Sequence, residues 1–94
     1  MTKSILSNEI ECYKCKTTLN LHQHHIFYGM GNRQISDRYG CWVYLCARHH
    51  NMSSEGVHYD SEYDKKLKRE CQLKWEELYG TREDFIKTFG RSYL

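Results

Sequence analysis

Two pairs of potential metal ligands in this chain share one spacing. Cys12 and Cys15 form a C-x-x-C pair, and Cys46 and His49 repeat that spacing 31 residues later. Zinc prefers four soft ligands in a tetrahedral arrangement, and a two-residue spacer lets a tight turn direct both members of a pair at one ion. We therefore predict a closed structural zinc site of three cysteines and one histidine. Bound zinc would add directly to the folding free energy of a small core.

The remaining cysteines do not indicate disulfide bonds. The chain has five cysteines, an odd number, and no feature of a secreted protein. Cys41 and Cys71 each lie among apolar residues, where a small buried thiol is the common role. We expect both to belong to the core.

The predicted zinc site uses only one of the six histidines, all of which lie between positions 22 and 58. A plain zinc finger does not need the five others, which are His22, His24, His25, His50 and His58. Neighbouring residues of a regular strand point to opposite faces, so His24 and His25 cannot both bind one ion. They can act on either side of a reacting phosphate, where one binds a metal and the other takes a proton from water.

These residues also carry a family resemblance. The segment LHQHHI, followed by LCARHH, resembles the HNH nucleases of the ββα-metal superfamily, which often combine the active hairpin with a C-x-x-C…C-x-x-C zinc site. That resemblance covers residues 12–58. The longer run from CYKC through GVHYD to FGRSYL is similar to small phage proteins related to the RecA-dependent nuclease of phage recombination enhancement. It implies a DNA endonuclease, and it leaves open whether a recombinase filament presents the DNA.

The resemblance assigns a role to each matching histidine. It implies that His25 is the general base, and that His24 and His50 bind the catalytic metal ion. His58 is the best remaining candidate for a third ligand. His22 is more often a surface residue of such a hairpin than a ligand.

The chain departs from the HNH pattern in two places. The central asparagine of the family falls near Cys41, and neither Cys41 nor Gly40 offers the side-chain carbonyl of an asparagine. We expect a backbone carbonyl or Asp37 to position His25 instead. In addition, the second zinc pair is Cys-His where the family has Cys-Cys.

The chemistry implied is hydrolysis of a phosphodiester bond. A divalent ion, which imidazole ligands allow to be Mg, Mn, Ni or Zn, would stabilise charge on the departing 3′ oxygen. Neutral His25 would deprotonate the attacking water. Basic side chains within residues 12–54 could bind neighbouring phosphates without reading the base sequence. These side chains are Lys14, Lys16, Arg33 and Arg38.

Two other functions fit part of the pattern. A non-catalytic zinc module that binds nucleic acid or protein would explain the four zinc ligands but not His24, His25 and His50. A Cys–His hydrolase fits poorly, because the cysteines are better used as ligands and no oxyanion loop is visible. The sequence does not distinguish a single-stranded from a double-stranded substrate.

A hairpin must position these residues. Residues 19–27 predict one strand, residues 30–40 a glycine-punctuated loop with one helical turn at 36–39, and residues 41–45 a second strand. The second strand would deliver Cys46, His49 and His50 into a short helical turn.

The C-terminal third predicts two helices that support the hairpin. Apolar residues recur at helical spacing in the first, at Leu67, Cys71, Trp75 and Leu78. Ser61, with Asp64 three residues later, resembles its N-cap, and Gly80 would end it. A second helix would begin at Thr81 and Asp84 and end at Gly90. Its buried apolar residues would be Phe85, Ile86 and Phe89.

Together these features predict one α+β domain over residues 1–94: a zinc-stapled ββα-metal (HNH) core at 12–58 and helices at 61–94. No apolar run approaches the roughly 20 residues of a membrane span, and no signal peptide is visible, so we expect a cytoplasmic protein, of a bacterial host if phage-derived. Residues 12–54 hold five basic residues and one acid, whereas residues 55–94 hold eight and nine. The basic half carries nearly all the histidines, which suits a polyanion such as nucleic acid. A locally uneven surface charge is the alternative interpretation.

Overall fold

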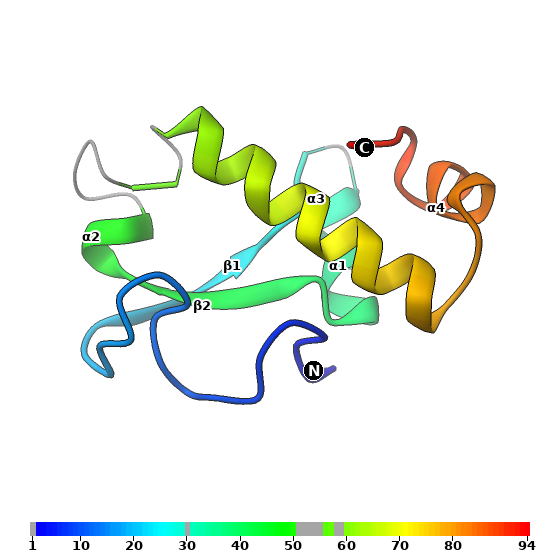
Figure 1. Cartoon of the computed structure of the whole chain (residues 1–94). Coiled ribbons are helices and arrows are strands. Elements are labelled where there is room, and N and C mark those ends of the chain that lie inside the picture. Colours follow the sequence, from blue (N-terminus) through cyan, green and yellow to red (C-terminus); the bar gives the residue numbers. More distant parts are fainter. Residues whose placement is uncertain (1, 30, 51–55, 58–59) are drawn as a thin grey trace.

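A computed structural model of the chain describes residues 2–29, 31–50, 56–57 and 60–94. Two strands and four helices follow one another along it (Figure 1): β1 (Leu21–His25), α1 (Asn32–Tyr39), β2 (Trp42–Cys46), α2 (Ala47–His50), α3 (Ser61–Leu78) and α4 (Arg82–Phe89). β1 and β2 form an antiparallel two-stranded sheet. The predicted α+β class, a hairpin with two C-terminal helices, is confirmed.

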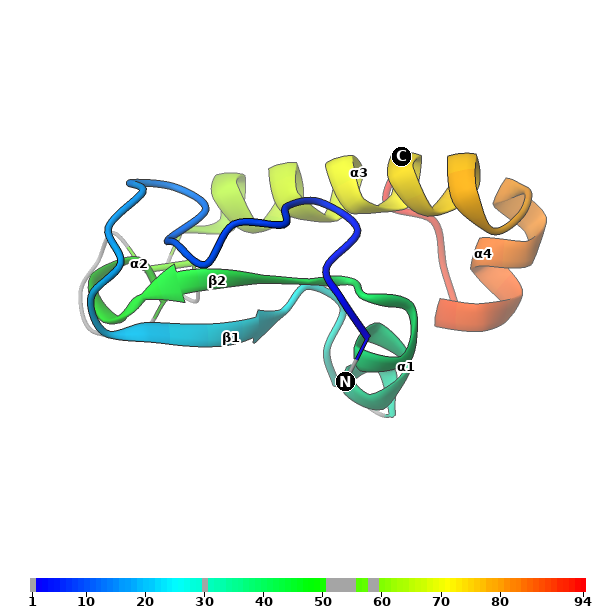
Figure 2. The same ribbon diagram turned by 90° about the horizontal axis from the view of Figure 1, so that it is seen from below.

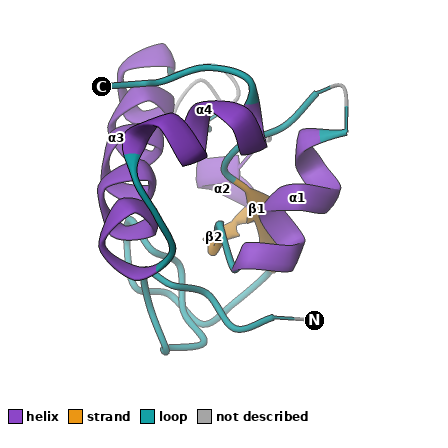
Figure 3. Cartoon of the chain, turned by 90° about the vertical axis from the view of Figure 1, so that its right-hand side faces the viewer, coloured by secondary structure: helices purple, strands orange, loops and turns teal. Residues whose placement is uncertain are grey.

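The helices surround the hairpin. Seen along the strands, the sheet lies between α3 on one side and α1 on the other (Figure 3). The N-terminal segment crosses β2 (Figure 2), where the Ile5 backbone N–H donates to the carbonyl of Gly40 and the Trp42 indole N–H donates to the carbonyl of Thr2. None of the helices in the described part of the chain has both the length and the apolar character that a membrane span requires.

The strand register divides the hairpin into two faces. His22 pairs with Leu45 and His24 with Val43. Directly opposed residues share a face, and Leu45 and Val43 belong to the buried core with Leu67 of α3. His22 and His24 therefore lie on the core side of the sheet, while His25 lies on the other side.

The first strand is shorter than the predicted range 19–27. Leu19 is exposed, and Asn20 has a left-handed φ of 53°, so β1 begins only at Leu21. At the other end the chain leaves the sheet after His25. The Ser36 hydroxyl donates to the carbonyl of Phe27 at 2.6 Å and accepts from its N–H at 3.2 Å, which holds that residue against α1 instead.

The predicted loop over 30–40 is wrong in its main part, because residues 32–39 form helix α1. The helix is delimited by Gly31 and Gly40, both with left-handed φ. Its sequence is polar, and only Ile35 and Tyr39 pack against the core, so the apolar periodicity is weak. Buried Ser36 adds the hydrogen bonds that fix the helix to the chain after β1.

Two element boundaries also differ from the predictions. β2 covers Trp42–Cys46 instead of 41–45, because the N–H of Cys41 donates to the carbonyl of Ser36 at the end of α1. The N-cap of α3 is Asp60, whose carboxylate accepts from the N–H of Tyr63, and not the predicted Ser61.

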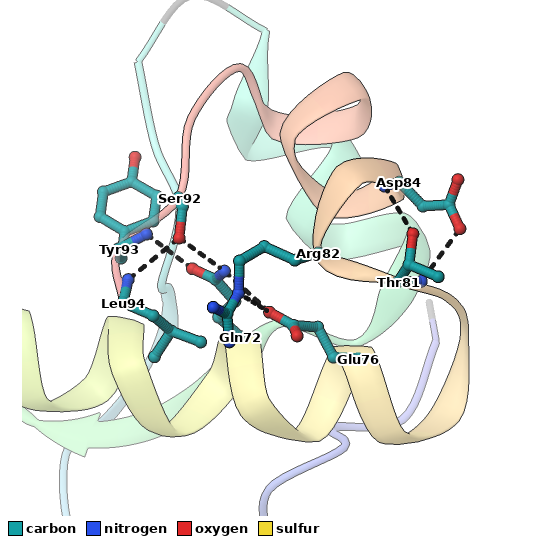
Figure 4. A network of polar contacts seen from close by, with 8 residues as sticks. All are labelled: Gln72, Glu76, Thr81, Arg82, Asp84, Ser92, Tyr93 and Leu94. Carbon is teal, nitrogen blue, oxygen red and sulfur yellow. Dashed lines mark hydrogen bonds and ion pairs between the residues drawn. The ribbon is translucent and has the colours of Figure 1, made fainter.

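The C-terminal helices follow their predicted course. Thr81 and Asp84, where this helix was expected to begin, form a capping box at the start of α4 (Figure 4), and Gly90 ends the helix. Cys41 and Cys71 are buried, as predicted. Leu78 and Ile86 were expected in the core, but they are 51% and 40% exposed, since each lies at the edge of its helix's apolar face.

Candidate metal centre

The four predicted zinc ligands converge on one point. One ligand atom from each of four side chains, Cys12, Cys15, Cys46 and His49, lies within 4.8 Å of all the others. Cys46 Sγ lies 3.8 Å from Cys15 Sγ and 3.3 Å from His49 Nδ1. Ligand atoms bonded to tetrahedral zinc at about 2.0–2.3 Å lie roughly 3.4–3.8 Å apart. These side chains are therefore close enough to hold a metal ion, with spacings near those of zinc.

A tight turn brings the first two ligands together. Lys16 adopts a left-handed φ of 68°, and its N–H donates to the carbonyl of Cys12 at 2.8 Å. The N–H of Cys12 donates in turn to the carbonyl of Thr17, and the N–H of Tyr13 donates to the carbonyl of Tyr44 in β2. The last bond places the turn beside the end of β2, where Cys46 lies.

Hydrogen bonds prepare Cys12 to act as a ligand. Burial raises the pKa of its thiol, but donors around the sulfur outweigh burial and lower this pKa to about 6. The donors are the His49 ring and the backbone groups of Cys46, Cys15 and Lys14. The thiolate is the form that binds metal, so the fold favours the ligand state of Cys12.

A second group of imidazoles lies next to this cluster, where α2 meets the core side of β1. His22 Nδ1 is 2.9 Å from His50 Nδ1. The His24 ring, which is only 2% exposed, lies with its centroid 5.3 Å from that of His50. The structure therefore brings His24 and His50 together, and it adds His22, for which the sequence favours a surface position.

His25 has different surroundings from its neighbour His24. Its Nε2 atom lies 3.5 Å from Oδ1 of Asp37, which also accepts from the Gln23 side chain at 3.3 Å. Asp37 belongs to α1, the helix that the sequence did not predict. Asp37, one of the two groups expected to position His25, therefore lies beside it.

Both adjacent histidines border one pocket of about 380 Å³. The residues that line it come from β1, α1, α2 and the segment after β1: Gln23, His24, His25, Tyr28, Gly29, Arg33 and His50. The pocket thus combines a histidine beside a carboxylate, two further imidazoles and a guanidinium. Such a set can bind an anion, transfer a proton and hold a cation.

The four predicted phosphate-binding cations occupy different places. Arg33 lines the pocket with His25. Lys14 and Lys16 lie on the turn that contains Cys12 and Cys15. The Lys14 ammonium is 3.9 Å from the Asp60 carboxylate, and the Lys16 ammonium is 3.9 Å from the Glu11 carboxylate. Arg38 lies in the last turn of α1 and does not line this pocket. Only Arg33 is placed beside the candidate reaction site.

His58 lies outside the described residues. Cys71 is hydrogen-bonded to Cys41, and this bond together with burial raises the Cys71 pKa well above that of an ordinary thiol. Such a pair is suited to core packing and not to nucleophilic or ligand chemistry.

Comparisons with known proteins give no relative from which a function could be transferred. No family model, curated protein or solved structure matches the chain.

Proposed function

We propose that this protein is a metal-dependent endonuclease that hydrolyses DNA phosphodiester bonds with HNH-type chemistry. The observation that carries the proposal is the pocket in which His25, held beside Asp37, adjoins His24, His50 and Arg33. The local resemblance to HNH motifs points to the same residues. A module that only binds zinc has no use for this second set of side chains.

The thiolate cluster would hold a structural zinc ion. Three sulfurs and one imidazole nitrogen form a closed donor set of the type that zinc occupies in structural sites. Cys46 and His49 flank the start of α2, and His50 follows directly. Zinc binding would thus fix the helical turn that carries His50 against β1.

The imidazole group is suited to a second, catalytic cation. Two nitrogens that each bind one metal ion at about 2.05 Å lie roughly 2.9–3.4 Å apart, depending on the bond angle. The 2.9 Å between the Nδ1 atoms of His22 and His50 fits this range. His22, His50 and the adjacent His24 would hold the ion, which would supply Lewis-acid stabilisation of the scissile phosphate and the departing 3′ oxygen.

Proton transfer falls to His25. In its neutral form it accepts a proton from the attacking water, and the nearby Asp37 carboxylate then stabilises the imidazolium. Asp37 would also orient the His25 ring, as the central asparagine orients the general base in the HNH family. Arg33, on the rim of the same pocket, would bind a non-bridging phosphate oxygen.

The proposal is tested by incubating zinc-loaded protein with supercoiled plasmid and Mg²⁺, Mn²⁺, Ni²⁺ or Zn²⁺ in turn. A parallel set uses single-stranded DNA coated with a recombinase filament. We expect nicking or linearisation with at least one ion, and ends that carry 3′-hydroxyl groups.

His25→Ala is the matched control for this assay. It should keep the melting temperature and metal content of the wild type while losing at least about 10²–10⁴-fold in cleavage rate, the usual contribution of a general base. Absence of scission under every condition would refute the nuclease and leave a zinc-stabilised binding module. Normal cleavage by His25→Ala would refute the role given to this residue.

A further inference from the structure

A basic pocket lies between α3 and the C-terminal segment, apart from the residues used so far. Its volume is about 180 Å³, and three exposed cations line it together with the last residues of the chain. The cations are Lys65, Arg69 and Arg91, and the other lining residues are Ser92, Tyr93 and Leu94. No aspartate or glutamate side chain lines this pocket.

Three carboxylates of α3 contact partners outside the lining of this pocket. Asp64 lies 2.8 Å from Lys68, Glu70 accepts from the Tyr13 hydroxyl, and Glu76 lies 3.4 Å from Arg82. Over the described ranges, Lys65, Arg69 and Arg91 form no ion pair. By contrast, Lys14 and Lys16 each lie near an acid. Three cations that form no ion pair within the described ranges therefore meet in this one pocket, with no acidic side chain among its lining residues.

A buried glutamine fixes the two sides of the pocket relative to each other. Gln72 of α3 is fully buried, and its side chain donates to the Ser92 hydroxyl at 3.0 Å and accepts from the N–H of Tyr93 at 2.6 Å (Figure 4). The C-terminal segment is thereby held against α3. Arg91 lies over the Tyr93 ring at 4.9 Å, next to Lys65 and Arg69, which are one helical turn apart.

A row of side chains joins this pocket to the one that contains His25. Tyr28 borders the His25 pocket, and Tyr93 borders the basic pocket. Between them the Lys68 ammonium lies 4.5 Å from the centroid of the Tyr28 ring and 5.3 Å from that of Tyr93. Burial lowers the pKa of Lys68, but the hydrogen bond and charge of Asp64 outweigh it and raise this pKa, so Lys68 is charged. The two pockets thus lie along one surface.

We propose that Lys65, Arg69 and Arg91 form a binding site for the phosphodiester backbone of the nucleic acid whose cleavage is proposed above. The choice of nucleic acid as the ligand rests on that proposed function. The site adds a direction: the nucleic-acid strand would leave the reaction site past Tyr28 and Tyr93 toward α3. Phosphates held there would position the substrate without reading its bases.

The test replaces all three cations by glutamine and measures binding of a fluorescent duplex oligonucleotide as a function of salt, in a His25→Ala background that leaves the DNA intact. Each lost phosphate contact lowers the slope of log K against log salt by about 0.9, so the slope should fall by about 2 to 3. Lys74→Gln, Arg82→Gln and Lys87→Gln together remove the same charge. Lys74 and Arg82 already face glutamates, so this control should keep the wild-type slope.

The outcomes separate this inference from the nuclease proposal. An unchanged slope in the first triple variant would refute the phosphate site even if the wild type cleaves DNA. An equal fall in both triple variants would also refute it, since net charge alone would explain binding. A fall confined to the first variant would support the site even if no cleavage is found. Melting temperatures of all variants should agree, because the substituted side chains are exposed or lie in surface ion pairs.

Discussion

Adjacent histidines on β1 have different chemical surroundings. His24 is 2% exposed and lies on the core side of the sheet near His50, whereas the His25 imidazole is 3.5 Å from the Asp37 carboxylate. The alternation of strand side chains separates the two rings, yet both border one pocket. One strand therefore presents two imidazoles with different surroundings to one pocket, as the proposed roles of metal ligand and proton acceptor require.

Asp37 is expected to act through His25. Asp37→Asn should reduce the cleavage rate by about 10–100-fold, by analogy with the cost of removing the hydrogen-bond partner of a histidine that binds a metal. Asp37→Glu should restore part of the rate, because it returns the carboxylate. Glu9→Gln, an exposed substitution remote from the pocket, is the control and should leave the rate unchanged. A full rate in Asp37→Asn would show that another group positions His25.

His22 is expected to share the catalytic ion with His50. His22→Ala should raise the metal concentration that gives half-maximal cleavage. The increase should be at least roughly 10–100-fold, which is the cost of losing a residue that only contacts a metal ligand. A high metal concentration should restore part of the cleavage rate. Leu19→Ala changes an exposed side chain of the same segment and should behave as wild type. If His22→Ala has an unchanged metal requirement, the short His22–His50 distance is a hydrogen bond and nothing more.

The Cys/His cluster and the proposed imidazole site were not equally predictable from the sequence. The C-x-x-C and C-x-x-H spacings could be read as one site because a local turn directs each pair, and the four ligand atoms do converge. The contact of His22 with His50 joins residues 28 apart. It depends on which face of β1 meets α2, and no local spacing encodes that face.

At the scale of elements, α1 has most influence on the candidate site. It carries Asp37 and Arg33 and fills the connection between the strands. Its sequence is polar, so apolar periodicity does not predict this helix. Helices α3 and α4 show such periodicity, and their predicted bounds are nearly correct. Helix α1 is defined by its glycine boundaries and by the hydrogen bonds of Ser36 to Phe27, a contact that depends on the tertiary fold.

Gly40 should be the more sensitive of two helix-ending glycines. Gly40 and Gly90 both have left-handed φ, but a Cβ at Gly40 would clash with the Lys3 carbonyl oxygen, whereas a Cβ at Gly90 would meet nothing within 4 Å. Gly90→Ala should cost about 1 kcal/mol from backbone strain alone. Gly40→Ala should cost more, because the N-terminal segment must also move. Denaturant melts of both variants measure the difference, and equal losses would contradict the packing described at Gly40.

For the whole molecule, the closed thiolate site is expected to decide whether the chain folds. Structural zinc contributes about 10–16 kcal/mol in small zinc domains, as much as the roughly 5–15 kcal/mol that stabilise a typical protein. Removal of zinc by a chelator should therefore abolish the cooperative melt followed by circular dichroism, and added Zn²⁺ should restore it. Cys41→Ser, outside the cluster, should keep its zinc. An unchanged melt after complete metal removal would show that the cysteines do not hold a structural ion.

The central claim is that one chain holds two metal sites of different chemistry, a thiolate site for the fold and an imidazole site for the reaction. It is tested most directly by counting metal ions per folded chain in non-denaturing mass spectrometry, with zinc-loaded protein and added Mn²⁺ or Ni²⁺. We predict two ions on the wild type and one, the zinc, on His50→Ala. A second ion that binds His50→Ala as strongly as the wild type, or a wild type that never takes up a second ion, would contradict the account.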